Sequence, residues 1–197
     1  APDTDAPTDA PTDAPTDAPT DAPSDKPTEA PTEKPTDKPK ETKPADFDDK
    51  GNITLGGWSD YVIVRGENSS SSEKAAAYQL QAYIKKLSGA TLKVVTDDAA
   101  PIDKELVVGK TNREEEGEFD REELGTDGFI IKTRDKKLFI AGGEVRGTLY
   151  GVYTYLEEYL GCRFYTAKFE KIPEYDALPF LEIEEDKQIP VFDVRNS

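Results

Sequence analysis

The sequence predicts an α/β (α+β) domain, in which a mixed β-sheet carries two main helices and follows a disordered Pro/Thr/Asp-rich linker. Three observations predict this fold class. Short apolar runs recur from Asn52 onward and are typical of buried strands. Two stretches carry apolar residues at the three- and four-residue spacing of a helix. Residues 1–46 hold 11 of the 15 prolines, which leaves about 150 residues for one folded domain.

Residues 1–46 repeat the four-residue unit Ala-Pro-Thr-Asp, which later drifts to Lys-Pro-Thr-Glu variants. A proline at every fourth position removes backbone donors and disfavours helix in the residue before it. We therefore expect an extended, disordered spacer like those that separate modules in secreted or cell-surface proteins. A plain disordered tail is the alternative.

The first half of the folded part is expected to place strands around one helix. Strands are predicted at 52–55 and 61–64, and a helix follows between Ser70 and Gly89. Ser70 and Glu73 make a capping box, and Gly89 is a typical helix end. The predicted buried face consists of Ala76, Leu80, Tyr83, Ile84 and Leu87.

The middle of the chain is expected to add strands on both sides of a charged connection. Strands are predicted at 92–96 and 106–108. The connection 110–124 holds room for one turn of helix, and its acids are expected to face solvent. Residues 129–133 and 138–141 flank a polar turn and predict an antiparallel hairpin.

The second main helix is predicted from apolar residues that recur on one face: Val145, Leu149, Val152, Tyr153, Leu156 and Leu160. Gly161 is expected to form its left-handed cap, and Glu144 to complement its dipole. Gly147 and Gly151 each cost about 1 kcal/mol relative to alanine, which indicates that another backbone packs closely there. Together with Tyr150 they are the candidate domain-packing residues.

The last part is predicted to add strands at 163–165 and 180–184, and 190–195 reads as the opening of a further strand. The α/β domain is therefore expected over 47–189, with the start of another domain at 190–197. Two helices cover one face of a sheet, and the second face is expected to need a partner domain because strands such as 61–64 are apolar on both sides.

Composition excludes several classes of function. The net charge of −16 makes nucleic-acid binding and adhesion to anionic membranes poor hypotheses. The absence of histidine removes Ser-His and Cys-His nucleophile pairs and His-based zinc sites. The single Cys162 is expected to be a buried thiol, and no apolar run is long enough to span a bilayer. We expect no catalytic residue, metal ligand or cofactor in these residues.

Three local patterns invite a functional interpretation and match it poorly. Asp46, Asp48 and Gly51 match the first, third and sixth positions of an EF-hand calcium loop. Lys50 and Gly57 do not fit the pattern, so a plain turn is expected. The glycine-rich turn 141–147 has the wrong spacing for a nucleotide and holds Glu144, which would repel a phosphate. Arg146 could pair with a substrate carboxylate or an acidic neighbour. Sugar rings could stack on a set of aromatic residues that are more often core: Trp58, Tyr150, Tyr155 and Tyr165.

Several runs together resemble the N-terminal domain of bacterial α-glucuronidase-like glycoside hydrolases, in particular a subgroup with an uncharacterised barrel, and a similar domain precedes the barrel of β-N-acetylhexosaminidases. The resemblance covers about Asn52 to Arg195. It is carried by Gly109-Lys-Thr-Asn112, Asp127-Gly-Phe-Ile-Ile-Lys, Ile140-Ala-Gly-Gly, Arg146-Gly-Thr-Leu-Tyr-Gly-Val-Tyr and Leu160-Gly-Cys-Arg-Phe-Tyr165. It implies a non-catalytic domain that packs on a TIM barrel holding the catalytic acids, with 190–195 as the entry to that barrel.

The expected function is therefore architectural: an accessory domain of a secreted or cell-surface, bacterial carbohydrate-active protein, which positions a downstream catalytic barrel of the same polypeptide. Arg163 and Tyr165 are the candidates for residues at the rim of the substrate cleft. The alternative is an independent module that binds a polysaccharide or cell-wall component. A self-sufficient hydrolase is disfavoured because no nucleophile–base pair is present.

Overall fold

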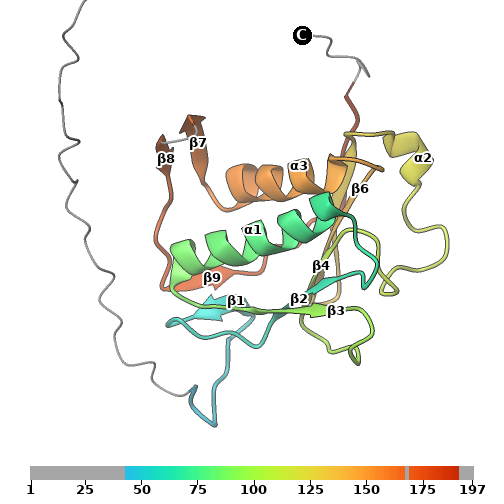
Figure 1. The fold of residues 1–197 in the computed structure, drawn as a ribbon. Helices are drawn as coiled ribbons and strands as arrows, with labels where there is room; N and C mark the ends of the chain where they lie inside the picture. The colour runs from blue at the N-terminus through green and yellow to red at the C-terminus, as the bar shows by residue number, and fades with distance from the viewer. Residues whose placement is uncertain (1–42, 167–168, 191–197) are drawn as a thin grey trace, which may run out of the picture. The chain divides into compact units, whose positions relative to one another are not determined.

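The structure is a computed structural model that describes residues 43–166 and 169–190 (Figure 1). The helices are α1 (Ser71–Ser88), α2 (Arg121–Leu124) and α3 (Gly147–Thr154), and α3 continues into a π-helical turn, η1 (Tyr155–Tyr159). The strands are β1 (Asn52–Leu55), β2 (Val62–Arg65), β3 (Lys93–Thr96), β4 (Glu105–Val108), β5 (Phe129–Arg134), β6 (Lys137–Gly142), β7 (Arg163–Thr166), β8 (Phe169–Lys171), β9 (Ala177–Pro179) and β10 (Asp186–Gln188).

The predicted linker conformation and nearly all of the predicted segment 190–197 lie outside the described residues, and the proposed domain boundaries stay predictions. Within the described part, the predicted α/β class with a mixed sheet and two main helices is confirmed.

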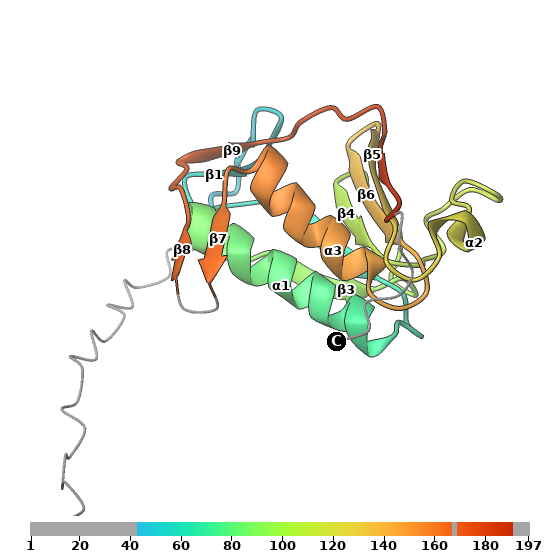
Figure 2. The same cartoon turned by 90° about the horizontal axis from the view of Figure 1, so that it is seen from above.

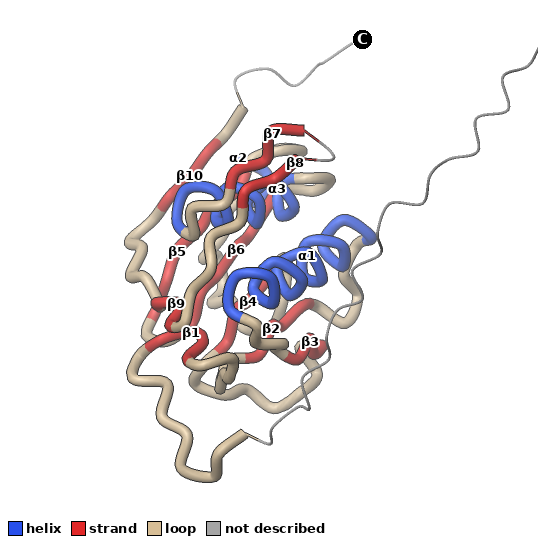
Figure 3. The backbone as a smooth tube through the Cα atoms, turned by 90° about the vertical axis from the view of Figure 1, so that its left-hand side faces the viewer, coloured by secondary structure: helices blue, strands red, loops and turns tan. Residues whose placement is uncertain are grey.

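The main sheet has six strands in the order β10-β5-β6-β4-β2-β3 (Figure 3). β3, β2, β4 and β6 run parallel, whereas β5 pairs antiparallel with β6 and β10. The predicted hairpin is therefore confirmed as β5–β6, and Asp135 takes the left-handed backbone conformation in its turn, with a φ of 54°. Two small antiparallel pairs, β1–β9 and β7–β8, lie outside this sheet.

The first helix agrees with the sequence at both ends and on its buried face. The Ser70 side chain accepts a hydrogen bond from the backbone of Glu73, whose carboxylate accepts one from the backbone of Ser70. Gly89 ends the helix with a φ of 76°. All five residues of the predicted apolar face are buried, so local sequence determines this element completely.

The second main helix, α3, begins later than its apolar pattern predicts. The backbone N–H groups of residues 144–147 donate to carbonyls of Gly125 and Thr126, and these tertiary bonds replace a first helical turn. Val145 is consequently 53% exposed rather than part of the buried face. Glu144 lies before the helix, which has no acid in its first turn, so its predicted role at the helix dipole is wrong. The predicted cap at Gly161 is confirmed by its φ of 71°.

The larger core lies between the main sheet and the pair α1 and α3, which run side by side (Figure 2). Alternating residues of β4 and β6, such as Leu106 and Ile140, meet Leu80 and Ile84 of α1 and Val152 of α3 in this core. Two helices on one face of the sheet were predicted, and this arrangement is confirmed.

The second face of the sheet is covered by the chain itself, so the expectation that it needs a partner domain is wrong. The intervening sheet residues Val107 and Phe139 form a smaller core with Phe119 and Leu124, which come from the charged connection after β4. The acids of this connection were expected to face solvent. The Glu118 side chain is instead only 4% exposed and pairs with two cations.

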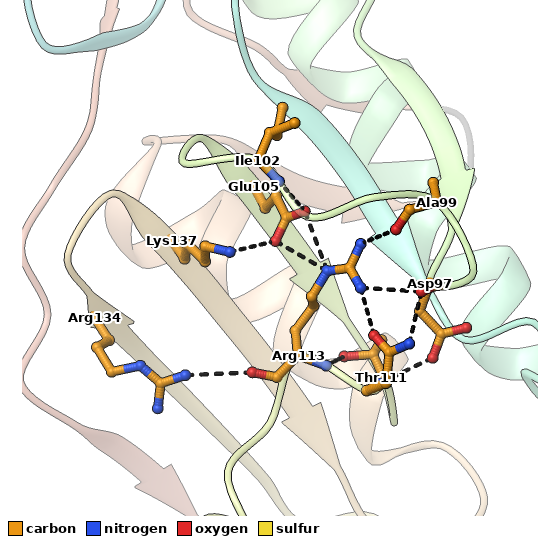
Figure 4. A network of polar contacts seen from close by, with 9 residues as sticks. Asp97, Ala99, Ile102, Glu105, Thr111, Arg113, Arg134 and Lys137 are labelled. Carbon is orange, nitrogen blue, oxygen red and sulfur yellow. Dashed lines mark hydrogen bonds and ion pairs between the residues drawn. The ribbon is translucent and has the colours of Figure 1, made fainter.

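A buried ion network fixes the charged connection against the second face (Figure 4). Glu105 of β4, whose side chain is 1% exposed, accepts hydrogen bonds from the Arg113 guanidinium at 3.2 Å and from Lys137 Nζ at 2.7 Å. Arg113 also donates to the carbonyl oxygens of Asp97 and Ala99. Glu105 was not selected from the sequence, because an acid at the first position of an apolar strand is usually solvent-facing.

The predicted strand at 180–184 is absent, and the real strands lie on either side of it as β9 and β10. Thr133 N–H donates to the carbonyl of Ile183, but Ile183 N–H donates to the hydroxyl of Thr133 rather than to a carbonyl. Because a side chain takes the place of the backbone acceptor, the ladder is interrupted at this point. β10 then resumes pairing with β5.

Acidification is expected to destabilise the domain below about pH 4.5. Burial alone would raise the pKa of Glu105 and Glu118, but hydrogen bonds from Lys137 and Lys132 and from backbone N–H groups outweigh it and lower both from 4.5. A carboxylate with a lowered pKa stabilises the fold above its unfolded-state pKa, and this contribution is lost as pH falls through the folded-state value. Urea midpoints measured between about pH 7 and pH 3 should therefore fall, and an unchanged midpoint would contradict the network.

Cys162 is expected to be unreactive in the folded protein. The thiol is fully buried, and burial, with smaller contributions from Glu170 and Glu157, raises its pKa to about 11. Since the thiolate is the reactive form, iodoacetamide should label Cys162 only after unfolding in urea. Complete labelling of the native protein at neutral pH would contradict this prediction.

Candidate functional site

The structure gathers aromatic side chains from α1, α3 and the β7–β8 hairpin on one side of the domain, and Figure 2 shows the hairpin beside α1. We call this the aromatic surface, and it has two parts: Tyr83, Tyr150, Tyr153 and Phe164 line a groove, and Tyr165 and Phe169 form a ring pair on the hairpin outside that lining. Of the residues singled out from sequence, Tyr150 lines the groove, whereas Tyr165 neighbours Phe164 along β7 and packs on Phe169 instead.

Three rings form the foundation of this surface. Tyr83, Tyr153 and Phe164 pack edge to face, with ring centroids 5.2 Å apart for the two pairs that include Phe164 and 6.2 Å for Tyr83–Tyr153. Such pairs contribute about 0.5–1.5 kcal/mol beyond the area they bury. They tie the hairpin to both helices and hold the outer rings on a fixed base.

The outer rings are exposed. Tyr165 and Phe169 expose 60% and 64% of their surface with their ring centroids 5.5 Å apart, and Tyr150 exposes 39%. A groove of about 490 Å³ opens between the helices and the hairpin, and it is lined by Tyr83, Tyr150, Tyr153, Glu157, Phe164, Thr166 and Glu170. The groove combines aromatic walls with acidic groups at its edge.

A hydrogen-bonded pair closes one end of the groove. The Tyr83 hydroxyl donates to Glu170 at 2.7 Å, and Lys86 Nζ donates to the other carboxylate oxygen at 2.5 Å. Burial and then Glu170 raise the pKa of Tyr83, so the hydroxyl stays protonated. The hydrogen bonds from Lys86 and Tyr83 lower the pKa of Glu170, which stays charged. A lowered pKa is the opposite of what a general acid needs.

Arg163 lies at the base of the hairpin and is held by its own surroundings. Its guanidinium donates to the carbonyl oxygens of Glu157 at 2.6 Å and Cys162 at 2.8 Å. Arg146 likewise pairs with Asp127 at 3.2 Å, so the acidic neighbour considered from sequence is its partner. The proposed roles of Arg163 and Tyr165 at a substrate rim remain predictions.

The two helix glycines lie inside the domain. A Cβ atom on Gly147 would come within 2.0 Å of the carbonyl oxygen of Gly128, and one on Gly151 within 2.7 Å of the Ile140 side chain. Gly147 therefore meets another backbone, whereas Gly151 meets side chains of β5 and β6. Packing of these residues with Tyr150 on a further domain remains a prediction.

From sequence, Tyr83 and Tyr153 were expected on buried helix faces, and Phe164 and Phe169 were not among the candidate site residues. The period of a helix indicates which residues are buried, but it does not indicate that a hairpin 80 residues later extends that face. Among the described residues, no cluster of three His, Cys, Asp or Glu side chains could hold a metal ion. The arrangement suits packing and stacking contacts.

Two family models match the chain. One, described as "Glycosyl hydrolase family 67 N-terminus", matches residues 53–155, slightly more than half of the chain. The other, described as "PT disordered repeat", matches residues 2–41. No curated protein matches. The first match contains the helix residues of the aromatic surface and ends before the β7–β8 hairpin, so it is shorter than the Asn52–Arg195 range of the sequence resemblance.

Proposed function

This chain belongs to the family of N-terminal domains of glycosyl hydrolase family 67, and we propose that it is a non-catalytic accessory domain that packs on a catalytic barrel of the same polypeptide and positions it for carbohydrate degradation. The aromatic surface is the proposed contact. Clustered exposed aromatic residues are typical of the centre of a protein interface, because burial of each ring removes a large apolar area from water.

The geometry of the aromatic surface supports this assignment. Its inner rings are fixed by edge-to-face contacts, so the surface is ordered before a partner binds and little conformational entropy is lost on docking. The acidic groups Glu157 and Glu170 flank the groove, and a partner with basic residues around an apolar centre would complement them.

The carboxylates of the domain support a non-catalytic role. Two of the most buried ones in the described ion pairs, Glu105 and Glu118, are each paired with two cations, and their pKa values are lowered. A glycosidase needs one carboxyl group whose pKa is raised and a second one across the sugar. We therefore expect the chain alone to show no turnover of aryl glycosides.

The repeat at residues 2–41 supports a secreted or cell-surface location for the proposed enzyme, because Pro/Thr-rich spacers typically separate modules there. None of the described helices has the length and hydrophobicity that crossing a membrane requires.

Substitution of Tyr150 and Phe169 by serine is expected to abolish docking without unfolding the domain. The catalytic region encoded downstream in the same gene would be expressed as a separate polypeptide with residues 1–197 and tested by co-purification. The wild-type chain should retain the barrel. The double variant should bind it at least about tenfold more weakly, because it lacks the two rings that docking would bury. The matched control is Tyr78→Ser, since Tyr78 is 52% exposed but belongs neither to the groove lining nor to the β7–β8 hairpin.

Unchanged co-purification of the double variant would contradict the proposed contact surface. Turnover of aryl glycosides by residues 1–197 alone would contradict the non-catalytic role. A gene that encodes no barrel after Ser197 would contradict the architectural proposal as a whole.

A further inference from the structure

A second concave region lies at the carboxyl ends of the four parallel strands. It is a cleft of about 800 Å³ that is open to solvent and lies within the size range of ligand sites. The loops that follow β2, β3, β4 and β6 line it, mainly through residues 66–69, 97–98, 110–112 and 142–144.

The topology of the sheet explains why a cleft opens here. β2 and β4 are neighbours, but the chain leaves β2 for α1 on one face and leaves β4 for the charged connection on the other face. The two exits therefore diverge and leave a crevice between them. In open α/β sheets such a switch point is where ligands bind, outside the carboxyl ends of the strands.

The walls of the cleft are fixed by the chain's own hydrogen bonds. The Asp97 carboxylate accepts from the backbone N–H groups of Glu67 at 2.8 Å and Asn112 at 2.9 Å, which links the exits of β2, β3 and β4. Glu73 of α1 accepts from the backbone N–H of Lys110 at 2.8 Å. A site with fixed walls loses little entropy when a ligand binds.

Four exposed side chains in the cleft have no hydrogen bond or ion pair with the described part of the chain: Glu67, Asn68, Lys110 and Glu144. The carboxylates accept hydrogen bonds, the ammonium group donates them, and the amide does both. Arg121 is not available in this way, because it forms a two-point ion pair with Glu114 at 2.7 Å.

The lining determines the class of ligand. Every side chain in it carries a polar or charged group, and the remaining positions are glycines, so no aromatic or aliphatic side chain is present to pack against an apolar ligand. Carboxylates outnumber cations, so a phosphate or a uronate would be repelled. A neutral ligand rich in hydroxyl groups matches both the donors and the acceptors.

We propose that this switch-point cleft binds a segment of a neutral oligosaccharide through the side chains of Asn68, Lys110, Glu67 and Glu144. The site goes beyond the proposed docking function and does not depend on the aromatic surface. Hydrogen bonds that stay exposed to solvent contribute little to the free energy of binding. The dissociation constant is therefore expected to be on the order of 1 mM.

The test is an NMR titration of the ¹⁵N-labelled chain with xylohexaose, cellohexaose and, as an anionic probe, hexa-galacturonate. At least one neutral probe should shift the amide signals of residues 66–69, 110–112 and 142–144 in a saturable manner, and hexa-galacturonate should not. Asn68→Ala with Lys110→Ala should weaken binding about tenfold or more, because two hydrogen-bonding groups are lost. The matched control is Asp103→Ala with Lys136→Ala. These residues lie just before the amino ends of β4 and β6, away from the cleft, and this variant should bind like the wild type.

Three results would overturn the proposal: no saturable shift with either neutral probe up to about 20 mM, equal binding of hexa-galacturonate, or unchanged affinity in the cleft double variant. Shifts centred on Tyr150 and Phe164 would place sugar binding at the aromatic surface and would also overturn it. Tyr150→Ser with Phe169→Ser should leave cleft binding intact, so failure of this proposal and failure of the docking proposal are distinguishable.

Discussion

Replacement of Glu105 by alanine is expected to lower the free energy of unfolding by about 3–5 kcal/mol. The change removes the only carboxylate paired with Arg113 among the described ion pairs, and the Arg113 side chain is 5% exposed. The guanidinium would keep its bonds to the carbonyls of Asp97 and Ala99 but would lose its counter-charge in a site that water hardly reaches. Urea unfolding followed by circular dichroism measures this loss.

Two further variants separate the ion pair from ordinary surface charge. Glu116→Ala removes an exposed acid of the same connection that forms no described ion pair, and its effect should stay within about 0.5 kcal/mol. Replacement of Glu105 by leucine together with Arg113 by methionine should restore much of the stability lost in Glu105→Leu, because the most buried cation of the network is then no longer left without a counter-charge. A double variant less stable than the single one would contradict this explanation.

Replacement of Gly147 by alanine is expected to destabilise the domain by about 3 kcal/mol, although alanine is the better helix former by about 1 kcal/mol. The added Cβ would lie 2.0 Å from the Gly128 carbonyl oxygen, and neither partner is a side chain that can rotate away. The start of α3 would have to move from the strand exits that it contacts. Thermal unfolding of the variant measures the effect.

Gly151→Ala is the matched comparison one turn later. Its Cβ would meet the Ile140 side chain at 2.7 Å and Phe129 at 3.3 Å, and side chains adjust more readily than backbone. The gain in helix propensity offsets part of this overpacking, so the loss should be less than half of that in Gly147→Ala. Equal losses in the two variants would show that backbone contact is not what distinguishes the two glycines.

The sequence predicted those parts of the fold whose signals are local. The capping box of Ser70 and Glu73, the cap at Gly89 and the apolar face of α1 depend on residues within a few turns of one another. The β5–β6 hairpin and the cap at Gly161 are likewise set by short-range patterns. Two predicted elements were wrong, the first turn of the second main helix and the strand at 180–184. In both, backbone N–H groups donate to distant residues, to the carbonyl of Thr126 and to the hydroxyl of Thr133.

The candidate sites were less accessible to sequence reasoning. Tyr150 and Tyr165 were named, but nothing in their local patterns placed Tyr150 in a groove with Phe164 or Tyr165 beside Phe169. The switch-point cleft joins four loops that are separated by whole elements, and its free side chains come from stretches that look like ordinary polar turns. Glu105 looks like a solvated acid until the connection after β4 folds back over it, and Glu118 looks like one until the same fold brings it onto Lys132 of β5.

The sequence by itself determined a Pro/Thr repeat, a domain of α/β class with two main helices, and membership of the family of N-terminal domains of glycosyl hydrolase family 67. Periodicity, caps and turn residues carry that information because each acts over a few residues. Only the tertiary structure decided which acids are buried and paired, which aromatic rings stay exposed, and where a cleft opens. Those properties depend on the distance between groups far apart in the chain, which is fixed only when the strands pair and their connections leave the sheet on opposite faces.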